Sequence, residues 1–324
     1  MIIDGHAHIG NEKFNNRNEI IIDAYLDYAK KVGINIGLIM PVPCPIIPND
    51  FGLAGGKILL TWEYDKLKEK HIDISEDDNL IKRDLINPYK EINNYYYKII
   101  DNYCGEVKLL FVPMIHPRLD TPQYLEELIN ECDPPAVKIH SVGTVSSPED
   151  ISKKYTKVLQ KYDVPVIVHT DYNNGKFDNN IGLYKAVDKA EANKWYDYFE
   201  KNHIKGTLNH GATLNLDVFS KINKSEYVKI GIEPSIFFGG DYRRLNINKE
   251  LYDSLGFLGI IKEYLDPSKI IFDTDFDYNR HNNDKIDYDT VKRIRDIWNG
   301  EDQEKVLYKN ALDQYPKIKL KVRR

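Results

Sequence analysis

Two histidines near the amino terminus have the spacing of a metal site. His6 and His8 flank Ala7 in the segment MIIDGHAHIG, which is apolar enough to form a buried strand. Successive side chains of a strand point to opposite faces, so both imidazoles face the same side and can reach one cation. Two ordinary core or surface histidines can have this spacing too, so the pair alone leaves both interpretations open.

Further histidines stand where strands are expected to end. His140, His169 and His210 each close an apolar run, and His116 directly follows another. Side chains at the carboxyl ends of parallel strands converge at the mouth of a barrel. The repeated placement therefore favours a shared metal site over a chance arrangement.

Carboxylates complete the candidate ligand set. The segment IIFDTDFDY supplies Asp273, Asp275 and Asp277 at a spacing of two. A carboxylate beside several histidines neutralises part of a cation's charge and can accept a proton from bound water. Because a zinc-type cation lowers the pKa of its water to about 7, these residue types indicate metal-assisted hydrolysis.

Eight apolar runs of strand length are available to position these residues. They cover residues 2–9, 34–42, 107–115, 136–140, 164–169, 206–210, 227–236 and 270–275. Amphipathic stretches of helical length separate most of them, at 89–103, 124–131, 151–162, 186–202, 251–265 and 302–315. Eight apolar strands alternating with helices predict an α/β fold, a (β/α)8 TIM barrel. An open doubly wound sheet is the alternative, but the glycine-rich phosphate loop expected after its first strand is missing from HIGNEKFN.

The length of 324 residues exceeds the roughly 250 that such a barrel needs. Most of the surplus lies in residues 43–88, a long insertion after the second strand, and a smaller part in the polar loop 171–184. Both follow strands and are expected at the mouth, as substrate-shaping loops or as plain surface loops. We predict a single metal-dependent hydrolase barrel domain over residues 1–324, with 43–88 as its lid.

Composition restricts the partners and the compartment. The net charge is −5 without a long basic block, so neither nucleic acid nor an anionic membrane is an expected partner. Three well-separated cysteines and no signal-peptide pattern indicate a cytoplasmic protein without a disulfide framework. The expected partner is a small-molecule substrate, and a homodimer is the commonest assembly for such an enzyme.

Taken in order, several motifs resemble the amidohydrolase superfamily. They are DGHAHIG, KIH, PVIVHTD, LNHGA, IIFDTDF and EKVLYKNALDQYP. The chain is most similar to the branch of amidohydrolase-related proteins that includes aminocarboxymuconate-semialdehyde decarboxylase, resorcylate decarboxylases and several lactonases. The resemblance covers residues 3–315.

The resemblance implies a divalent metal held by His6, His8, His169 and Asp275. It implies that His210 orients or deprotonates the attacking water or polarises the substrate, with Asp275 as the second catalytic group. Asp-Thr-Asp stands where the family has Gly-Ser/Thr-Asp, so Asp273 is a departure from the pattern. The metal is expected to be zinc, with manganese, iron or cobalt as alternatives, since the donor set suits each of them.

Lys138 leaves the number of metal ions open. In binuclear members of the superfamily, a carbamylated lysine at this position bridges two ions. In close relatives with a similar Lys-x-His the site looks mononuclear, and the lysine would anchor an anionic group of the substrate. We favour one ion and a substrate-binding Lys138, with an ion pair to Asp275 or Asp171 as the purely structural interpretation.

His140 and Arg280 complete the expected substrate-binding set. His140 shares the face of Lys138 and would contact substrate or support a metal ligand. Arg280, in the loop DYNRHNN, has a guanidinium that could clamp a carboxylate, or is an ordinary surface residue.

The leading hypothesis is a metal-dependent hydrolase that cleaves a C–O or C–N bond of a small anionic lactone, ester or amide. The alternative is a non-oxidative metal-dependent decarboxylase of a carboxylated aromatic or muconate-like compound. A non-catalytic barrel binding protein is a third hypothesis, and it predicts loss of metal ligands that this chain retains.

Overall fold

The computed structural model describes residues 1–9, 18–41, 87, 89–141, 144, 146–152, 154–170, 191–234, 247–276 and 287–322. The predicted insertion at 43–88, apart from Asn87, and the loop at 171–184 lie outside the described residues. The prediction that 43–88 forms a lid of one domain therefore stays a prediction.

Eight short strands form the centre of the described fold, all paired in parallel. They are β1 (Ile3–His8), β2 (Ile36–Met40), β3 (Lys108–Phe111), β4 (Val137–Ile139), β5 (Val166–Val168), β6 (Gly206–Leu208), β7 (Val228–Ile232) and β8 (Ile270–Phe272). Each lies within one of the eight runs expected from the sequence. Apart from the first residue of β3, every strand residue is buried, as continuous apolar strands of a parallel sheet require.

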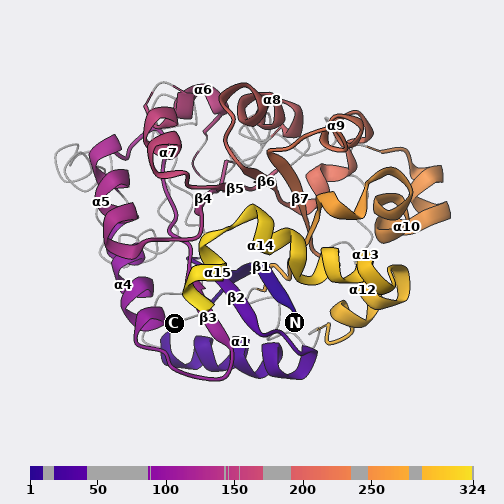
Figure 1. The fold of residues 1–324 in the computed structure, drawn as a ribbon, viewed down its shortest axis with the longest axis horizontal. Helices are drawn as coiled ribbons and strands as arrows, with labels where there is room; N and C mark the ends of the chain where they lie inside the picture. Colours follow the sequence, from indigo (N-terminus) through magenta and orange to yellow (C-terminus); the bar gives the residue numbers. More distant parts are fainter. Residues whose placement is uncertain are drawn as a thin grey trace, which may run out of the picture.

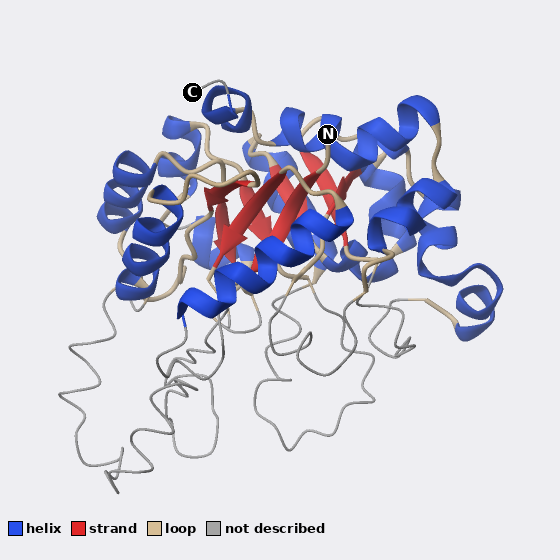
Figure 2. Ribbon diagram, turned by 90° about the horizontal axis from the view of Figure 1, so that it is seen from below, coloured by secondary structure: helices blue, strands red, loops and turns tan. Residues whose placement is uncertain are grey.

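The strands pair in two sheets, β1-β2-β3 and β4-β5-β6-β7-β8, and these join at both edges. Parallel bridges link Met114 to Lys138 at one edge and Phe276 to Ala7 at the other. Backbone hydrogen bonds support both joins, including one of 2.7 Å from the His8 N–H to the Phe276 carbonyl. The ring of eight strands is thus completed, and Figure 2 shows it enclosed between helices on both sides. The predicted TIM barrel is confirmed.

Helices surround the ring in chain order (Figure 1). The longer ones are α1 (Asn18–Val32), α4 (Lys90–Asp101), α5 (Pro122–Cys132), α7 (Thr156–Tyr162), α8 (Ala192–Asn202), α9 (Leu216–Ile222), α10 (Lys249–Tyr264) and α12 (Thr290–Ile297). The short ones are α6 (Pro148–Ser152), α13 (Gly300–Glu304), α14 (Asn310–Gln314) and α15 (Lys317–Val322). A π-helical turn, η7 (Lys305–Lys309), joins α13 to α14, and the 3-10 turn η6 (Pro267–Lys269) precedes β8.

Helix α5 shows how local sequence fixes these elements. The Thr121 side chain accepts a hydrogen bond from the Tyr124 N–H, and Pro122 fills the first turn, where its missing N–H costs nothing. The helix ends where Asp133 adopts a left-handed backbone conformation. Its buried positions recur with helical spacing and pack against the barrel: Tyr124, Leu125, Leu128, Ile129 and Cys132.

The carboxy-terminal helices α14 and α15 lie across the amino ends of the strands (Figure 1). Tyr315, between them, is completely buried, and its hydroxyl lies 2.7 Å from the Thr207 hydroxyl of β6. The Gln314 amide donates to the carbonyl oxygens of Gly206 and Tyr227. This end of the barrel is therefore filled with packed side chains, and access to the interior must come from the opposite, carboxyl end.

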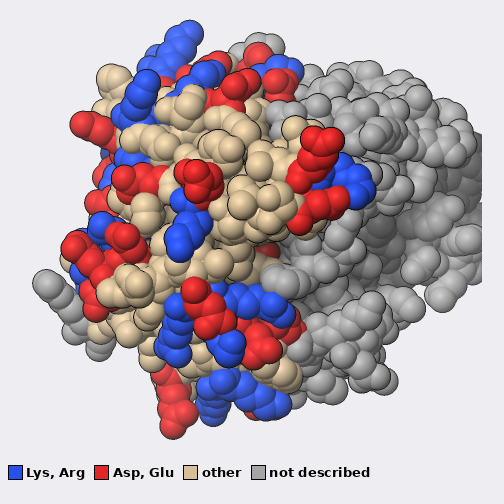
Figure 3. Space-filling view, turned by 90° about the vertical axis from the view of Figure 1, so that its right-hand side faces the viewer, with Lys and Arg blue, Asp and Glu red and all other residues tan. Residues whose placement is uncertain are grey.

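The described surface carries both signs of charge. Figure 3 shows Lys and Arg interspersed with Asp and Glu on the face that bears α10, α12 and α13. Ion pairs join neighbouring helical turns, such as Lys292 with Asp296 in α12 and Lys249 with Asp253 in α10. Among the described helices, not one combines the length and the apolar character needed to cross a bilayer.

Candidate metal centre

The predicted site residues that the structure describes meet at the carboxyl ends of the strands. They are His6 and His8 of β1, Lys138 of β4, His140 just beyond it, His169 after β5, His210 after β6 and Asp275 after β8. The first strand has an irregular register with β2 between Asp4 and Ala7. Such bulges re-aim side chains beside active sites, and here the irregularity includes His6.

Three buried donor atoms form a triangle of metal-binding size. His6 Nε2 lies 2.9 Å from His8 Nε2 and 3.6 Å from Asp275 Oδ1. His8 Nε2 lies 3.5 Å from the same carboxylate oxygen. Ligand atoms held about 2.1 Å from one tetrahedral zinc ion are about 3.4 Å apart. The three residues therefore fit a single divalent cation, and none has more than 7% of its side chain exposed.

Neighbouring groups contact the second ring nitrogen of each histidine. His8 Nδ1 lies 2.8 Å from the Pro41 carbonyl oxygen, which can only accept, so in the neutral ring the lone pair is on Nε2. His6 Nδ1 contacts the side-chain amide of Asn209 and lies 3.6 Å from Glu233 Oε1. Burial, with the adjacent Lys138 charge, lowers the pKa of His6 well below its usual value. Metal binding requires the neutral imidazole that this environment favours.

Asp275 is held in place through the first strand. Its backbone has a positive φ of 46°, and its N–H donates to the His6 carbonyl over 2.8 Å. The preceding Thr274 donates from both its N–H and its hydroxyl to the Asp4 carboxylate, at 2.9 and 2.7 Å. Asp4 also accepts from the His6 N–H and from the Tyr25 hydroxyl. One buried carboxylate thus ties both ligand-bearing segments together.

Asp273 occupies a different environment from Asp275. A Cβ added to Gly5 would lie 2.4 Å from Asp273 Oδ1, and one added to Gly231 would lie 1.9 Å from Oδ2. The carboxyl group therefore fills the space left by two glycines inside the barrel, where burial and the nearby Glu233 and Asp4 charges raise its pKa well above the usual value. Neither of its oxygens has a hydrogen-bond partner among the described residues. It forms a second group with Glu233 and His6, and His6 is the residue that this group shares with the triangle.

Lys138 lies completely buried beside the triangle. Its Nζ is 3.2 Å from His6 Nε2. Burial lowers its pKa to about 8, although the charges of Asp275, Glu233 and Asp273 act in the opposite direction. At neutral pH most of the lysine is therefore an ammonium, and a minor part is the free amine that carbamylation would need. The position fits both interpretations of Lys138 drawn from the sequence.

His169 lies with His210 and His140. His169 Nδ1 is 2.7 Å from His210 Nε2, and the His140 ring stacks on His169 with centroids 4.0 Å apart. His169 is not a member of the three-donor groups found among the described residues. Its place as the fourth metal ligand, and the catalytic place of His210, stay predictions from the resemblance.

Sequence reasoning missed three residues of the site: Asp4, Asn209 and Glu233. Glu233 is completely buried directly after β7, and it contacts both His6 and His210. The available signal was the run YVKIGIEPSI, in which Glu233 is the one acidic residue and directly follows the buried strand residues. Asp4 likewise lies within the first strand, two residues before His6.

Three residues expected at the mouth lie outside the described residues: Asp171, Asp277 and Arg280. A fourth, His116, is described and lies outside the triangle's three-donor group. His116 is buried beside Tyr89, with ring centroids 6.1 Å apart, and its N–H donates to Asp120. It belongs to neither three-donor group found in the described part of the chain.

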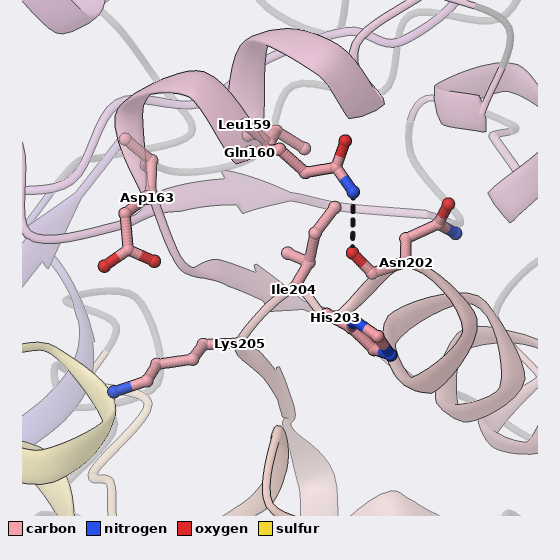
Figure 4. Close-up of a pocket in the computed structure, with 8 residues that line it drawn as sticks. Leu159, Gln160, Asp163, Asn202, His203, Ile204 and Lys205 are labelled. Atoms are coloured by element: carbon pink, nitrogen blue, oxygen red, sulfur yellow. Dashed lines mark hydrogen bonds between the residues drawn. The ribbon is translucent and has the colours of Figure 1, made fainter.

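A small pocket lies at the opposite end of the strands (Figure 4). It has a volume of about 200 Å³ and is formed where α7 and α8 end and lead into β5 and β6. Its lining includes Gln160, Asp163 and Lys205, while the His203 ring stacks on Tyr227. It is therefore separate from the histidine cluster, which lies at the carboxyl ends.

Comparison with known proteins identifies relatives by structure. No protein-family model matches the chain, and no curated protein matches it significantly. Among solved structures, it is similar to a probable 2-pyrone-4,6-dicarboxylic acid hydrolase from Acinetobacter baumannii with citric acid bound. The TM-score is 0.56 and the identity 12%, over 97% of this chain and 99% of that one.

A second similar structure is an apo protein from Agrobacterium tumefaciens. Its TM-score is 0.54 and its identity 12%, over 97% of this chain and 95% of that one. At such identities the likeness establishes the fold over nearly the full length. The chain thus has the fold of these structures.

Proposed function

We propose that this protein is a metal-dependent hydrolase of the amidohydrolase superfamily. The observation that carries the proposal is the triangle of His6, His8 and Asp275, whose three buried donor atoms are spaced as ligands of one divalent cation. By the resemblance, His169 is the fourth ligand. Three imidazoles and a carboxylate suit zinc, which we propose as the metal, bound as a single ion.

Each residue of the site has a place in hydrolysis. A bound divalent cation would supply Lewis acidity and would lower the pKa of a water molecule toward neutrality. Asp275 is the proposed proton acceptor, since its carboxylate is part of the triangle and lies in a buried environment that strengthens charge interactions. His210 is the proposed group that polarises the substrate, at the mouth after β6.

An anionic substrate is favoured by the charge of Lys138. Its ammonium is completely buried at the site, where it can pair with a substrate carboxylate out of competition with water. The structural relative from Acinetobacter baumannii carries the name of a dicarboxylic lactone hydrolase and holds a tricarboxylate. We therefore propose a small lactone that bears a carboxylate as the substrate class.

The test is an assay of zinc-loaded protein against carboxylated lactones, esters and amides, and separately against carboxylated aromatics. We expect ring opening of lactones by the wild type and none by Asp275→Asn. The Lys138→Met variant should raise KM for carboxylated lactones far more than for uncharged ones. Release of carbon dioxide without ring opening would overturn the hydrolase proposal in favour of the decarboxylase alternative.

A further inference from the structure

Glu233 contacts His210 at two points. Its Oε1 accepts a hydrogen bond of 3.2 Å from the His210 backbone N–H. Its Oε2 lies 3.4 Å from His210 Nδ1 and has no hydrogen-bond partner among the described residues. Glu233 is completely buried. A proton on His210 Nδ1 would therefore lie opposite a carboxylate oxygen that is shielded from water. The Glu233 side chain therefore contacts both the backbone N–H and the ring of His210.

The backbone at His210 begins a turn of unusual, left-handed conformation. Residues 210–214 all have positive φ values between 45° and 59°, and only Gly211 of the five is a glycine. In this left-handed region a Cβ lies too close to the following carbonyl oxygen, so each residue that carries a Cβ is strained. Conformations of this kind persist at functional sites where the surroundings hold them. The bond from the His210 N–H to Glu233 holds the first residue of the turn.

The contacts continue from His210 to His169. His210 Nε2 lies 2.7 Å from His169 Nδ1, within hydrogen-bonding distance. If the His210 proton is on Nδ1, facing Glu233, then His210 Nε2 can only accept. His169 must then donate from Nδ1, and its own lone pair is placed on Nε2. The direction of the hydrogen bond between the two rings thus follows from the position of the Glu233 carboxylate.

We propose that Glu233 is a positioning residue that fixes the tautomers of His210 and His169 through this series of contacts. In consequence His169 presents the Nε2 lone pair that a metal ligand needs. This last consequence rests on the proposed metal-dependent function, whereas the tautomers themselves do not. Carboxylates that orient ligand histidines are a recurrent feature of metal sites, but here the carboxylate acts through an intervening histidine.

The variant Glu233→Gln tests the proposal with almost no change in shape. The carboxamide oxygen can still accept the His210 backbone N–H, while its NH2 group replaces Oε2 opposite His210 Nδ1. Since that NH2 group can only donate, His210 should move its proton to Nε2, and His169 should follow. Asp120→Asn is the matched control, because Asp120 is also a buried carboxylate that accepts from a backbone N–H, that of His116.

The tautomers can be read in metal-free protein at pH 8 by long-range proton–nitrogen NMR of ¹⁵N-histidine samples. Signals are assigned with His169→Gln and His210→Gln. We expect Nδ1–H at His169 and His210 in the wild type and in Asp120→Asn, and Nε2–H at both in Glu233→Gln. An Nε2–H tautomer of His169 in the wild type overturns the proposal, even if the Glu233 variant does not fold.

Zinc affinity, measured by calorimetry, provides the second readout. Glu233→Gln should raise the Kd by about 10- to 100-fold, and Asp120→Asn by less than twofold. Unchanged tautomers and affinity in Glu233→Gln would overturn the positioning of His169 by Glu233. If the wild type bound no metal, the proposed function would fail, while the tautomers would still decide the role of Glu233.

Discussion

Replacing Asp4 by alanine is expected to loosen the join between the first and last strands. The carboxylate accepts from the His6 N–H at 3.2 Å, the Tyr25 hydroxyl at 3.0 Å, and the Thr274 N–H and hydroxyl at 2.9 and 2.7 Å. All four donors belong to buried residues, so Asp4→Ala leaves them without this acceptor. At about 1 kcal/mol net for each bond, the loss is about 4 kcal/mol.

One opposing contribution reduces this figure. Burial raises the pKa of Asp4 to about 7, which shows that the carboxylate is poorly solvated, and its removal relieves that cost. We therefore expect Asp4→Ala to lower the free energy of unfolding by about 2–4 kcal/mol. At about 2 °C per kcal/mol for a chain of this size, the melting temperature should fall by about 4–8 °C.

The assay is differential scanning calorimetry of metal-free protein at pH 8, above the raised pKa of Asp4, where the group is mostly a carboxylate in the folded protein. Asp4→Asn is the matched variant, since its one carbonyl oxygen can keep the two backbone N–H donors. The hydroxyls of Tyr25 and Thr274 can turn to accept from its NH2 group. It should lose less than half as much stability as Asp4→Ala. A melting temperature of Asp4→Ala within 1 °C of the wild type would refute the reasoning.

Two further predictions concern the interior and the pH dependence. Gly231→Ala should lower the free energy of unfolding by about 1–3 kcal/mol, because its Cβ would lie 1.9 Å from Asp273 Oδ2. Gly259→Ala, with a nearest contact of 3.2 Å to a side-chain Cβ, is the calorimetric control and should change little. Burial raises the pKa of Asp120 to about 8, so the folded state keeps a proton that the unfolded chain loses near pH 4. Stability should therefore decrease as pH rises from about 4 to 8, and urea titrations should find a smaller decrease for Asp120→Asn.

The barrel could be predicted because each buried strand leaves a continuous apolar run in the sequence. Helix boundaries were harder to predict from the sequence. The single helix expected at 151–162 is two helices, α6 and α7. The Ser152 hydroxyl bonds back to the Glu149 carbonyl at the end of α6, and Tyr155 is then completely buried and bonded to the Asp120 carbonyl. Thus α6 ends at Ser152, and α7 begins directly after the buried Tyr155.

The candidate site was predictable only in part, for a similar reason. His6 and His8 share one strand, so their common face follows from periodicity alone. The run YVKIGIEPSI places Glu233 at a strand end, but its role depends on which side chains β1, β6 and β7 bring together, and the local sequence does not reveal that. The left-handed turn after His210 is equally hidden, because only Gly211 in NHGATL signals unusual backbone conformations.

The most direct test of the central claim is the stoichiometry and affinity of zinc binding. Metal-free wild-type protein, titrated by calorimetry, should bind one ion per chain. Asp275→Asn should keep the fold and lose at least 100-fold in affinity, since it removes the charged donor of the triangle. Absence of binding, two ions per chain, or an unchanged affinity of Asp275→Asn would each contradict a single metal held by His6, His8 and Asp275.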